Sequence, residues 1–279
     1  LLDPDDRLFT RINRWALTAV SPPATVTLAK LDGLAKIRCR RLLVRLPEYA
    51  RACYRRLPAH LLEYGQIRCG RLPAHTGERP MNIELALANL KRHGFDAVYF
   101  DTAAQAAEYV AGELKVMSVG IGGSKTVEAM GLYEALAEQG EVYWHWKQPT
   151  AEERDRAAHA QAYLSSANGI SETGEIVNID GMGNRVASTI YGHDRVVFVA
   201  GINKLAPNLH AAIARAKNVA SPLNARRFGK QTPCVLTEPM CCHDCDCPDR
   251  ICRTTVIIDR KPMGIARMDV VLIDEELGY

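Results

Sequence analysis

The stretch Val116-Met-Ser-Val-Gly-Ile-Gly-Gly-Ser-Lys-Thr126 joins an apolar run to a glycine-rich turn that opens a helical pattern. Residues 116–121 are typical of a strand, and Ser124 stands where an N-cap residue of the next helix belongs. A strand that passes through a short turn into a helix is the repeating unit of parallel sheets. This stretch therefore predicts an α/β fold.

The same alternation of strand and helix patterns continues on both sides. Upstream, Ile83, Leu87 and Leu90 share a helical face that stops at Gly94, a strand follows at 97–100, and a capping box opens a helix over 102–114. Downstream we expect one helix that ends near 140, a strand at 142–146 and a helix opened by a second capping box, formed by Thr150 and Glu153.

Four later runs, at 175–179, 195–202, 254–259 and 268–274, are apolar and rich in β-branched residues. Such nearly continuous runs indicate strands that are covered on both faces. The sequence therefore predicts one domain over 81–279, with three layers: a mostly parallel sheet and helices on both of its faces.

Residues 1–80 differ from the rest of the 279-residue chain, because they carry a net charge of +8 while the remainder carries −5. Arg-Leu-Pro recurs irregularly in this segment, and the first methionine is Met81. We interpret residues 1–80 as sequence translated upstream of the natural start, or as a fused remnant. The alternative is a basic tail for nucleic acid or an acidic partner. Aromatic residues are too sparse there for single-strand binding, so no nucleic-acid partner is expected.

Ligands of parallel sheets bind beyond the carboxyl ends of the strands, which directs attention to the turns. The glycine turn offers a phosphate or carboxylate cradle made of Gly120, Gly122, Gly123, Ser124 and Thr126. The alternative is a tight turn in which Ser124 is only an N-cap. The GxxxxGK[ST] spacing of a Walker A loop is absent.

The segment 171–188 crowds polar side chains around three glycines. Asp180 or Glu172 would serve as a general base if partly desolvated, although Asp180 also suits a simple turn. Two further loops, 201–204 and 221–227, bring cationic and amide groups to the same edge. We predict Asp180, Glu172 and Lys204 as catalytic candidates, and as ligand-binding candidates Asn178, Asn184, Arg185, Asn203 and Arg226 together with the glycine turn.

Six of the nine cysteines fall between 234 and 252. Four of them, Cys234, Cys242, Cys245 and Cys252, form one C-x-x-C pair flanked by single cysteines. Four soft ligands suit a zinc ion or an iron–sulfur cluster, and the spacing does not choose between them. Redox-active thiols and inert packing are the alternatives. His243 could replace one cysteine.

Nothing in the sequence marks the chain for export or for a membrane. The N-terminus is acidic, and Pro22 and Pro23 interrupt the apolar stretch at 15–29 before it could span a bilayer. A cytoplasmic protein without a membrane partner is expected, and a homo-oligomer stays open.

Several stretches together resemble the lactate-utilization (LUD) domain family: VGIGGSKTVEAMGL, SETGEIVNIDGMGNRVASTIYG, VVFVAGINKL, VASPLNARR, TPC and CHDCDCPDRIC. The resemblance covers 81–279. It implies a fold like that of ribose phosphate isomerase and the CoA transferases, and a role in the oxidation of lactate to pyruvate alongside iron–sulfur partner proteins. The family often has serine where this chain has Cys247, so we treat Cys241 and Cys247 as non-ligands. The alternative function is a non-catalytic regulator that binds a phosphorylated or carboxylated metabolite.

Overall fold

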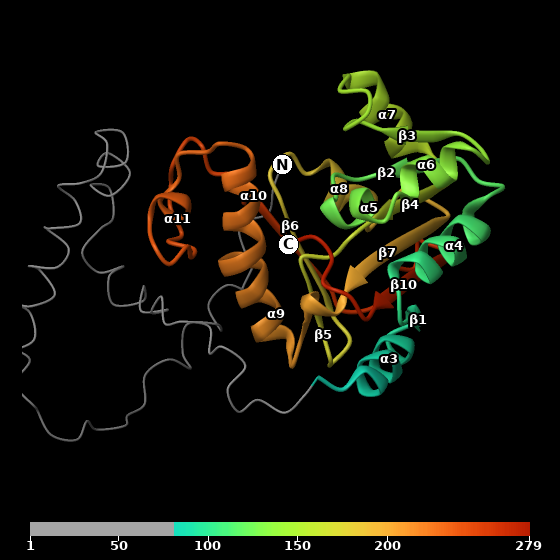
Figure 1. Ribbon diagram of the computed structural model, residues 1–279, viewed down its shortest axis with the longest axis horizontal. Coiled ribbons are helices and arrows are strands. Elements are labelled where there is room, and N and C mark those ends of the chain that lie inside the picture. Colours follow the sequence, from blue (N-terminus) through green and yellow to red (C-terminus); the bar gives the residue numbers. More distant parts are fainter. Residues whose placement is uncertain (1–80) are drawn as a thin grey trace, which may run out of the picture. The chain divides into compact units, whose positions relative to one another are not determined.

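The computed structural model describes residues 81–279, and the predictions for residues 1–80 lie outside the described part. Six parallel strands form the main sheet (Figure 1). In spatial order they are β1 (Asp96–Phe100), β10 (Arg267–Ile273), β7 (Arg195–Gly201), β4 (Ala162–Ser165), β2 (Val119–Ile121) and β3 (Val142–Trp144). The predicted α/β fold with a mostly parallel sheet is confirmed.

A second sheet of four short strands was not predicted. Its order is β8 (Leu205–Ala206), β5 (Gly169–Ser171), β6 (Ile176–Asp180) and β9 (Thr254–Ile258), and β6 pairs antiparallel with both β5 and β9. The run 254–259 is a strand, as predicted, but the expectation that both of its faces are covered was wrong. Because β9 is an edge strand, Thr254 and Thr255 are exposed.

Helices lie on both faces of the main sheet (Figure 1). On one face, Val110, Val127 and Leu136 pack against the strand residues Val199 and Val271. They belong to α4 (Ala103–Leu114), α5 (Lys125–Ala129) and α6 (Leu132–Ala137). The other face packs against α3 (Ile83–Arg92) and the second sheet in one apolar cluster. The remaining helices are α7 (Ala151–His159), α8 (Asn184–Ser188), α9 (Leu209–Arg215), α10 (Ser221–Arg227) and α11 (Pro233–Leu236).

Two details of the predicted helices needed correction. The single helix expected to end near 140 is two helices, α5 and α6, because Gly131 adopts a left-handed conformation (φ 63°) between them. The predicted capping box at Thr102 is confirmed. At α7, Thr150 caps the helix, but the Glu153 carboxylate accepts the backbone N–H of Trp144 at 2.9 Å instead of completing a box.

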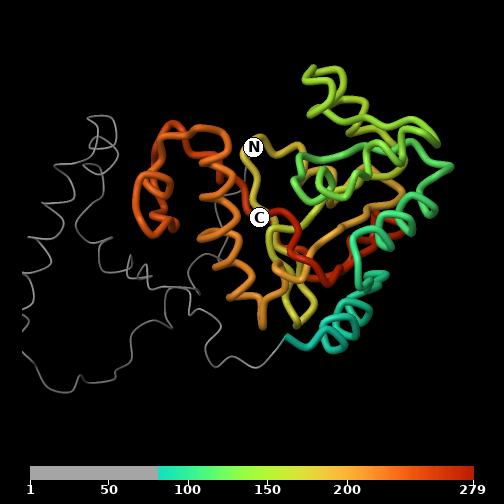
Figure 2. Tube along the Cα trace, in the orientation of Figure 1, coloured from blue at the N-terminus to red at the C-terminus, as the bar shows by residue number. Residues whose placement is uncertain are grey.

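Residues 209–227 form one continuous helical segment (Figure 2), in which a π-helical turn, Ala216–Ala220, joins α9 to α10. Pro222 stands in the first turn of α10 and has no N–H for the carbonyl four residues earlier. The regular i to i−4 hydrogen-bond pattern of the helix is therefore interrupted here, as at many functional sites.

A search of residues 81–279 for a helix with the length and hydropathy needed to span a bilayer finds none.

A buried ion-pair network ties α4 to the sheet. Arg195 donates two hydrogen bonds to the Asp269 carboxylate, at 2.7 and 3.0 Å, and one each to the carboxylate (2.7 Å) and the backbone carbonyl (3.1 Å) of Glu113. Arg267 contacts both acids, at 2.9 and 3.0 Å. Because Asp269 is only 1% exposed, its charge depends on these two guanidinium groups.

The substitution Asp269→Asn should lower the free energy of unfolding by about 3–5 kcal/mol, because it leaves two guanidinium groups without their buried counter-charge. Urea denaturation measures the loss. Glu152→Gln is the matched control: it removes the exposed pair with Arg156 and should change stability by about 0–1 kcal/mol. Equal losses in the two variants would contradict the assignment.

Candidate functional site

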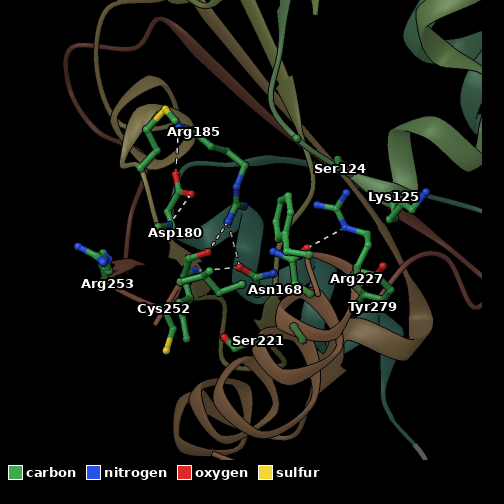
Figure 3. Close-up of a pocket in the computed structure, with 18 of the residues that line it drawn as sticks. Ser124, Lys125, Asn168, Asp180, Arg185, Ser221, Arg227, Cys252, Arg253 and Tyr279 are labelled. Carbon is green, nitrogen blue, oxygen red and sulfur yellow. Dashed lines mark hydrogen bonds between the residues drawn. The ribbon is translucent and has the colours of Figure 1, made fainter. Parts of the chain in front are cut away.

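A cavity of about 460 Å³ lies beyond the carboxyl ends of the central strands. Its walls come from the loops after β2, β3, β4 and β7, from α8 and α10, and from the loop before β9 (Figure 3). This is the edge at which parallel sheets bind their ligands. The cavity falls within the usual size range of small-molecule sites.

Lys204 lines this cavity and lies in the short turn that follows β7. Its side chain is 3% exposed, and its Nζ donates to the hydroxyl oxygens of Thr126, at 2.6 Å, and Ser166, at 2.7 Å. Within the described part of the chain, it has no carboxylate at ion-pair distance. Burial, together with the positive charges of Arg215 and Arg185, lowers the pKa of Lys204 to about 7.

Two arginines, the buried Arg185 and the partly buried Arg215, lie near enough to Lys204 for their charges to act on it. Arg185 donates to the side chains of Asn178 (2.6 Å) and Asn168 (3.1 Å), and to two carbonyl oxygens. Arg215 donates to the carbonyl oxygens of Asn203 and Asn168, both at 2.6 Å. Burial lowers the pKa of both arginines, to about 10 for Arg215. Three cations thus gather without a carboxylate ion pair to any of the described residues.

The two acidic candidates are both held by backbone groups. The Asp180 carboxylate lines the cavity and accepts the N–H groups of Gly181 (2.9 Å), Arg185 (3.1 Å) and Val186 (3.3 Å), so it caps α8. Glu172 lies elsewhere, outside the cavity lining, and accepts the backbone N–H of Asn82 at 2.5 Å.

The glycines of the turn after β2 mainly allow other parts of the protein to pack closely against the backbone. A Cβ on Gly120 would meet Ala157 O of α7 at 2.1 Å, and one on Gly122 would meet Arg185 Cγ at 2.9 Å. Gly123 lies against Trp146 and lines the cavity with Ser124. Ser124 caps α5, as the alternative interpretation expected.

Of the other predicted ligand-binding residues, one lines the cavity and the rest lie outside its lining. Asn184 lines the cavity. Asn178 is buried beneath Arg185, and its amide oxygen also accepts Asn168 N–H at 3.1 Å. Asn203 instead accepts the backbone N–H of Leu277 at 3.2 Å. Arg226 is exposed and does not line the cavity; its neighbour Arg227 does.

Sequence reasoning missed an aromatic wall. Trp146 stacks on Trp144 with ring centroids 5.3 Å apart and lines the cavity. The Arg227 guanidinium lies 4.7 Å from the centroid of the Trp146 ring and 4.0 Å from that of Phe228. Figure 3 shows Lys125 and Arg227 on one side of the cavity, opposite Cys252 and Arg253. The sequence predicted a strand over 142–146 and so placed Trp146 within it, whereas β3 ends at Trp144.

The cysteine segment forms the wall next to β9. Burial raises the pKa of Cys234, and the charges of Cys245, Cys252 and Cys242 raise it further. The Asp244 N–H points at Cys242 Sγ (3.4 Å), inside the C-x-x-C pair. Arg250 donates to the carbonyl oxygens of Cys245 (2.6 Å) and Cys252 (2.9 Å).

These donors suit a soft metal, because they are free thiols with an N–H group directed at one sulfur. As placed, however, no three His, Cys, Asp or Glu side chains within 81–279 lie close enough together to hold an ion. Metal binding would thus require the loop 237–253, which has no helix or strand, to close around the ion.

Comparisons with known proteins give one family. Residues 83–273 match the family described as the LUD domain. A crystal structure of a DUF162 family protein from Deinococcus radiodurans is similar, with 14% sequence identity and a TM-score of 0.43 over 70% of this chain and 99% of that chain. No curated protein matched at a significant level.

The substitution Lys204→Met should remove a pH-dependent part of the stability. The folded-state pKa of about 7 lies below the ordinary 10.5, so between these values the unfolded state binds more protons and the wild type gains stability as pH rises. The difference in unfolding free energy, wild type minus variant, should grow by about 2 kcal/mol from about pH 7 to about pH 9. Urea denaturation at the two pH values measures it. A constant difference would mean that Lys204 titrates normally.

Proposed function

Because the chain belongs to the LUD domain family, which is associated with lactate utilization, we propose that it takes part in the oxidation of lactate to pyruvate and that its cavity binds a small hydroxy or keto acid. The proposal places the ligand at the carboxyl ends of β2, β4 and β7, against Lys204.

The observation that carries this proposal is a set of three cations, the buried Arg185 and Lys204 and the partly buried Arg215, with no carboxylate ion pair to the described residues. A buried charge is costly unless it is paired, and among residues 81–279 the hydrogen-bond acceptors of all three cations are neutral oxygens. A ligand carboxylate would supply the missing negative charge. Arg185 and Arg215 are held by protein oxygens, so they act on such a ligand mainly through their charge.

Oxidation of lactate to pyruvate releases two electrons and two protons, which require an acceptor. We propose that iron–sulfur partner proteins receive the electrons. We also propose that Cys234, Cys242, Cys245 and Cys252 hold a zinc ion or an iron–sulfur cluster next to the cavity. Bound there, a cluster would carry electrons, whereas zinc would fix the loop. Cys252 is the link between the two sites, because it lines the cavity as well.

A regulator that binds the metabolite without chemistry is the second candidate. It is favoured by the state of the two acidic groups: Asp180 caps α8 and Glu172 accepts a backbone N–H outside the cavity. Neither carboxylate is free to act as a general base in this arrangement. Cavity binding is common to both candidates, and turnover distinguishes them.

Isothermal titration with L-lactate, pyruvate and inorganic phosphate tests binding. Lys204→Met should weaken binding of the preferred anion about 10- to 100-fold, the usual worth of a hydrogen bond to a charged group. Lys91→Met, which removes an exposed lysine in the last turn of α3, should leave the affinity unchanged. If none of the three anions binds, or if both variants bind equally well, the cavity is not the ligand site. Lactate-dependent dye reduction by the purified protein, measured in parallel, would favour the catalytic candidate over the regulator.

Metal analysis of anaerobically purified protein tests the cysteine set. Cys245→Ser should lose the bound metal, because it removes one of four ligands. Cys247→Ala is the matched control in the same loop and should keep the metal. Metal-free wild type, or equal metal content in both variants, would remove the metal from this proposal.

A further inference from the structure

We propose that Lys204 forms a covalent imine with the carbonyl carbon of a 2-oxo acid in the cavity. The inference rests on the proposed function and goes further, because it assigns a covalent step to one residue. It also makes the oxidised product, rather than lactate itself, the ligand that the lysine recognises.

Lys204 differs from the other lysines of the cavity. Lys125 forms an ion pair with Glu128, and Lys230 lies 3.6 Å from Asp249. Both are much more exposed than Lys204, whose hydrogen-bond partners in the described part of the chain are the two hydroxyl groups. With a pKa of about 7, a large share of Lys204 is neutral amine near neutral pH, whereas an ordinary lysine is almost entirely ammonium. Only the neutral amine is a nucleophile.

The two hydroxyl groups fit this amine. Thr126 Oγ1 donates its own hydrogen to Leu277 O at 3.1 Å, so it is free to accept from Nζ. Ser166 Oγ accepts at 2.7 Å. A neutral amine has two hydrogens, and these two acceptors satisfy both. Among residues 81–279, the nitrogen lone pair is then left without a hydrogen-bond donor, on a side chain that lines the cavity.

The charges around Nζ come from two other elements. Arg185 lies in the first turn of α8, and Arg215 is the last residue of α9. The positive charges of both side chains favour the neutral amine of Lys204 over its ammonium form. The charge of Asp180 acts on Arg185, whose pKa it raises against the lowering caused by burial. The same two guanidinium charges attract the carboxylate that lies next to the carbonyl in every 2-oxo acid.

The step balances without an oxidant. The amine lone pair attacks the carbonyl carbon and forms the C–N bond, while one amine hydrogen passes to the carbonyl oxygen and gives a carbinolamine. The second amine hydrogen then joins the same oxygen, the C–O bond breaks, and water leaves with formation of the C=N bond. Ser166 Oγ, a hydroxyl 2.7 Å from Nζ, is placed to carry these protons.

Borohydride trapping tests the imine on the full chain. The protein is incubated with pyruvate and sodium borohydride, digested and mapped by mass spectrometry. Reduction should leave a stable pyruvate-derived amine on the peptide that contains Lys204, and none without pyruvate. Lys204→Arg should lose the adduct, while Lys230→Arg, a lysine of the same cavity, should keep it. Mapping the wild type alone locates the adduct, so the test does not depend on the folding of a variant.

The outcomes separate this inference from the proposed function. If pyruvate binds by isothermal titration but no borohydride-dependent adduct forms on Lys204, the imine is wrong and anion binding stands. If adducts spread equally over Lys125 and Lys230, the labelling is nonspecific and the imine is also wrong. If pyruvate neither binds nor labels, the inference falls together with pyruvate as the ligand.

Discussion

The cavity depends on one constraint: a buried lysine amine is held by two hydroxyl groups, and no carboxylate of residues 81–279 lies at ion-pair distance from it. Burying an ammonium without a counter-charge is costly, and two neighbouring guanidinium groups add to the cost. A fold can keep such a group when deprotonation or a bound anion removes the cost. Both possibilities lead to function, since the first makes a nucleophile and the second makes a binding site. Perturbed lysines of this kind are a physical marker of functional sites.

The sheet order explains how three distant residues meet. β7, β4 and β2 are neighbours, and the residues that follow them include Lys204, Ser166 and Thr126. Because parallel strands end at one edge, the three side chains converge there. Glycines permit the approach: a Cβ on Gly278 would lie 2.6 Å from Thr126 Oγ1, and Gly122 makes room for Arg185. The glycine turn that the sequence suggested as an anion cradle thus serves largely to let charged side chains close in.

Much of the frame could be predicted from the sequence, because continuous β-branched runs and helix caps are local signals. β4 and β5 are only four and three residues long and lie between stronger patterns, so Ser166 and Asn168 were missed with them. Lys204 and Arg185 were found because they follow strong strand and glycine signals. The direction of individual side chains could not be predicted from the sequence. The Asp180 side chain turns back to cap α8, and the phase of α10 places Arg227 rather than Arg226 at the cavity. The role of Trp146 depends on where β3 ends, which no local pattern fixes.

Direct titration of Lys204 tests the central claim most sharply. In protein labelled with ¹³C-lysine, the Lys204 side-chain resonance is assigned by its loss in Lys204→Arg and followed by NMR from neutral to alkaline pH. The account predicts a midpoint at about 7 in the free protein, because burial and two cations oppose protonation. It also predicts a higher midpoint when a carboxylate ligand is bound. A midpoint at the ordinary lysine value of 10.5, unchanged by ligand, would contradict it.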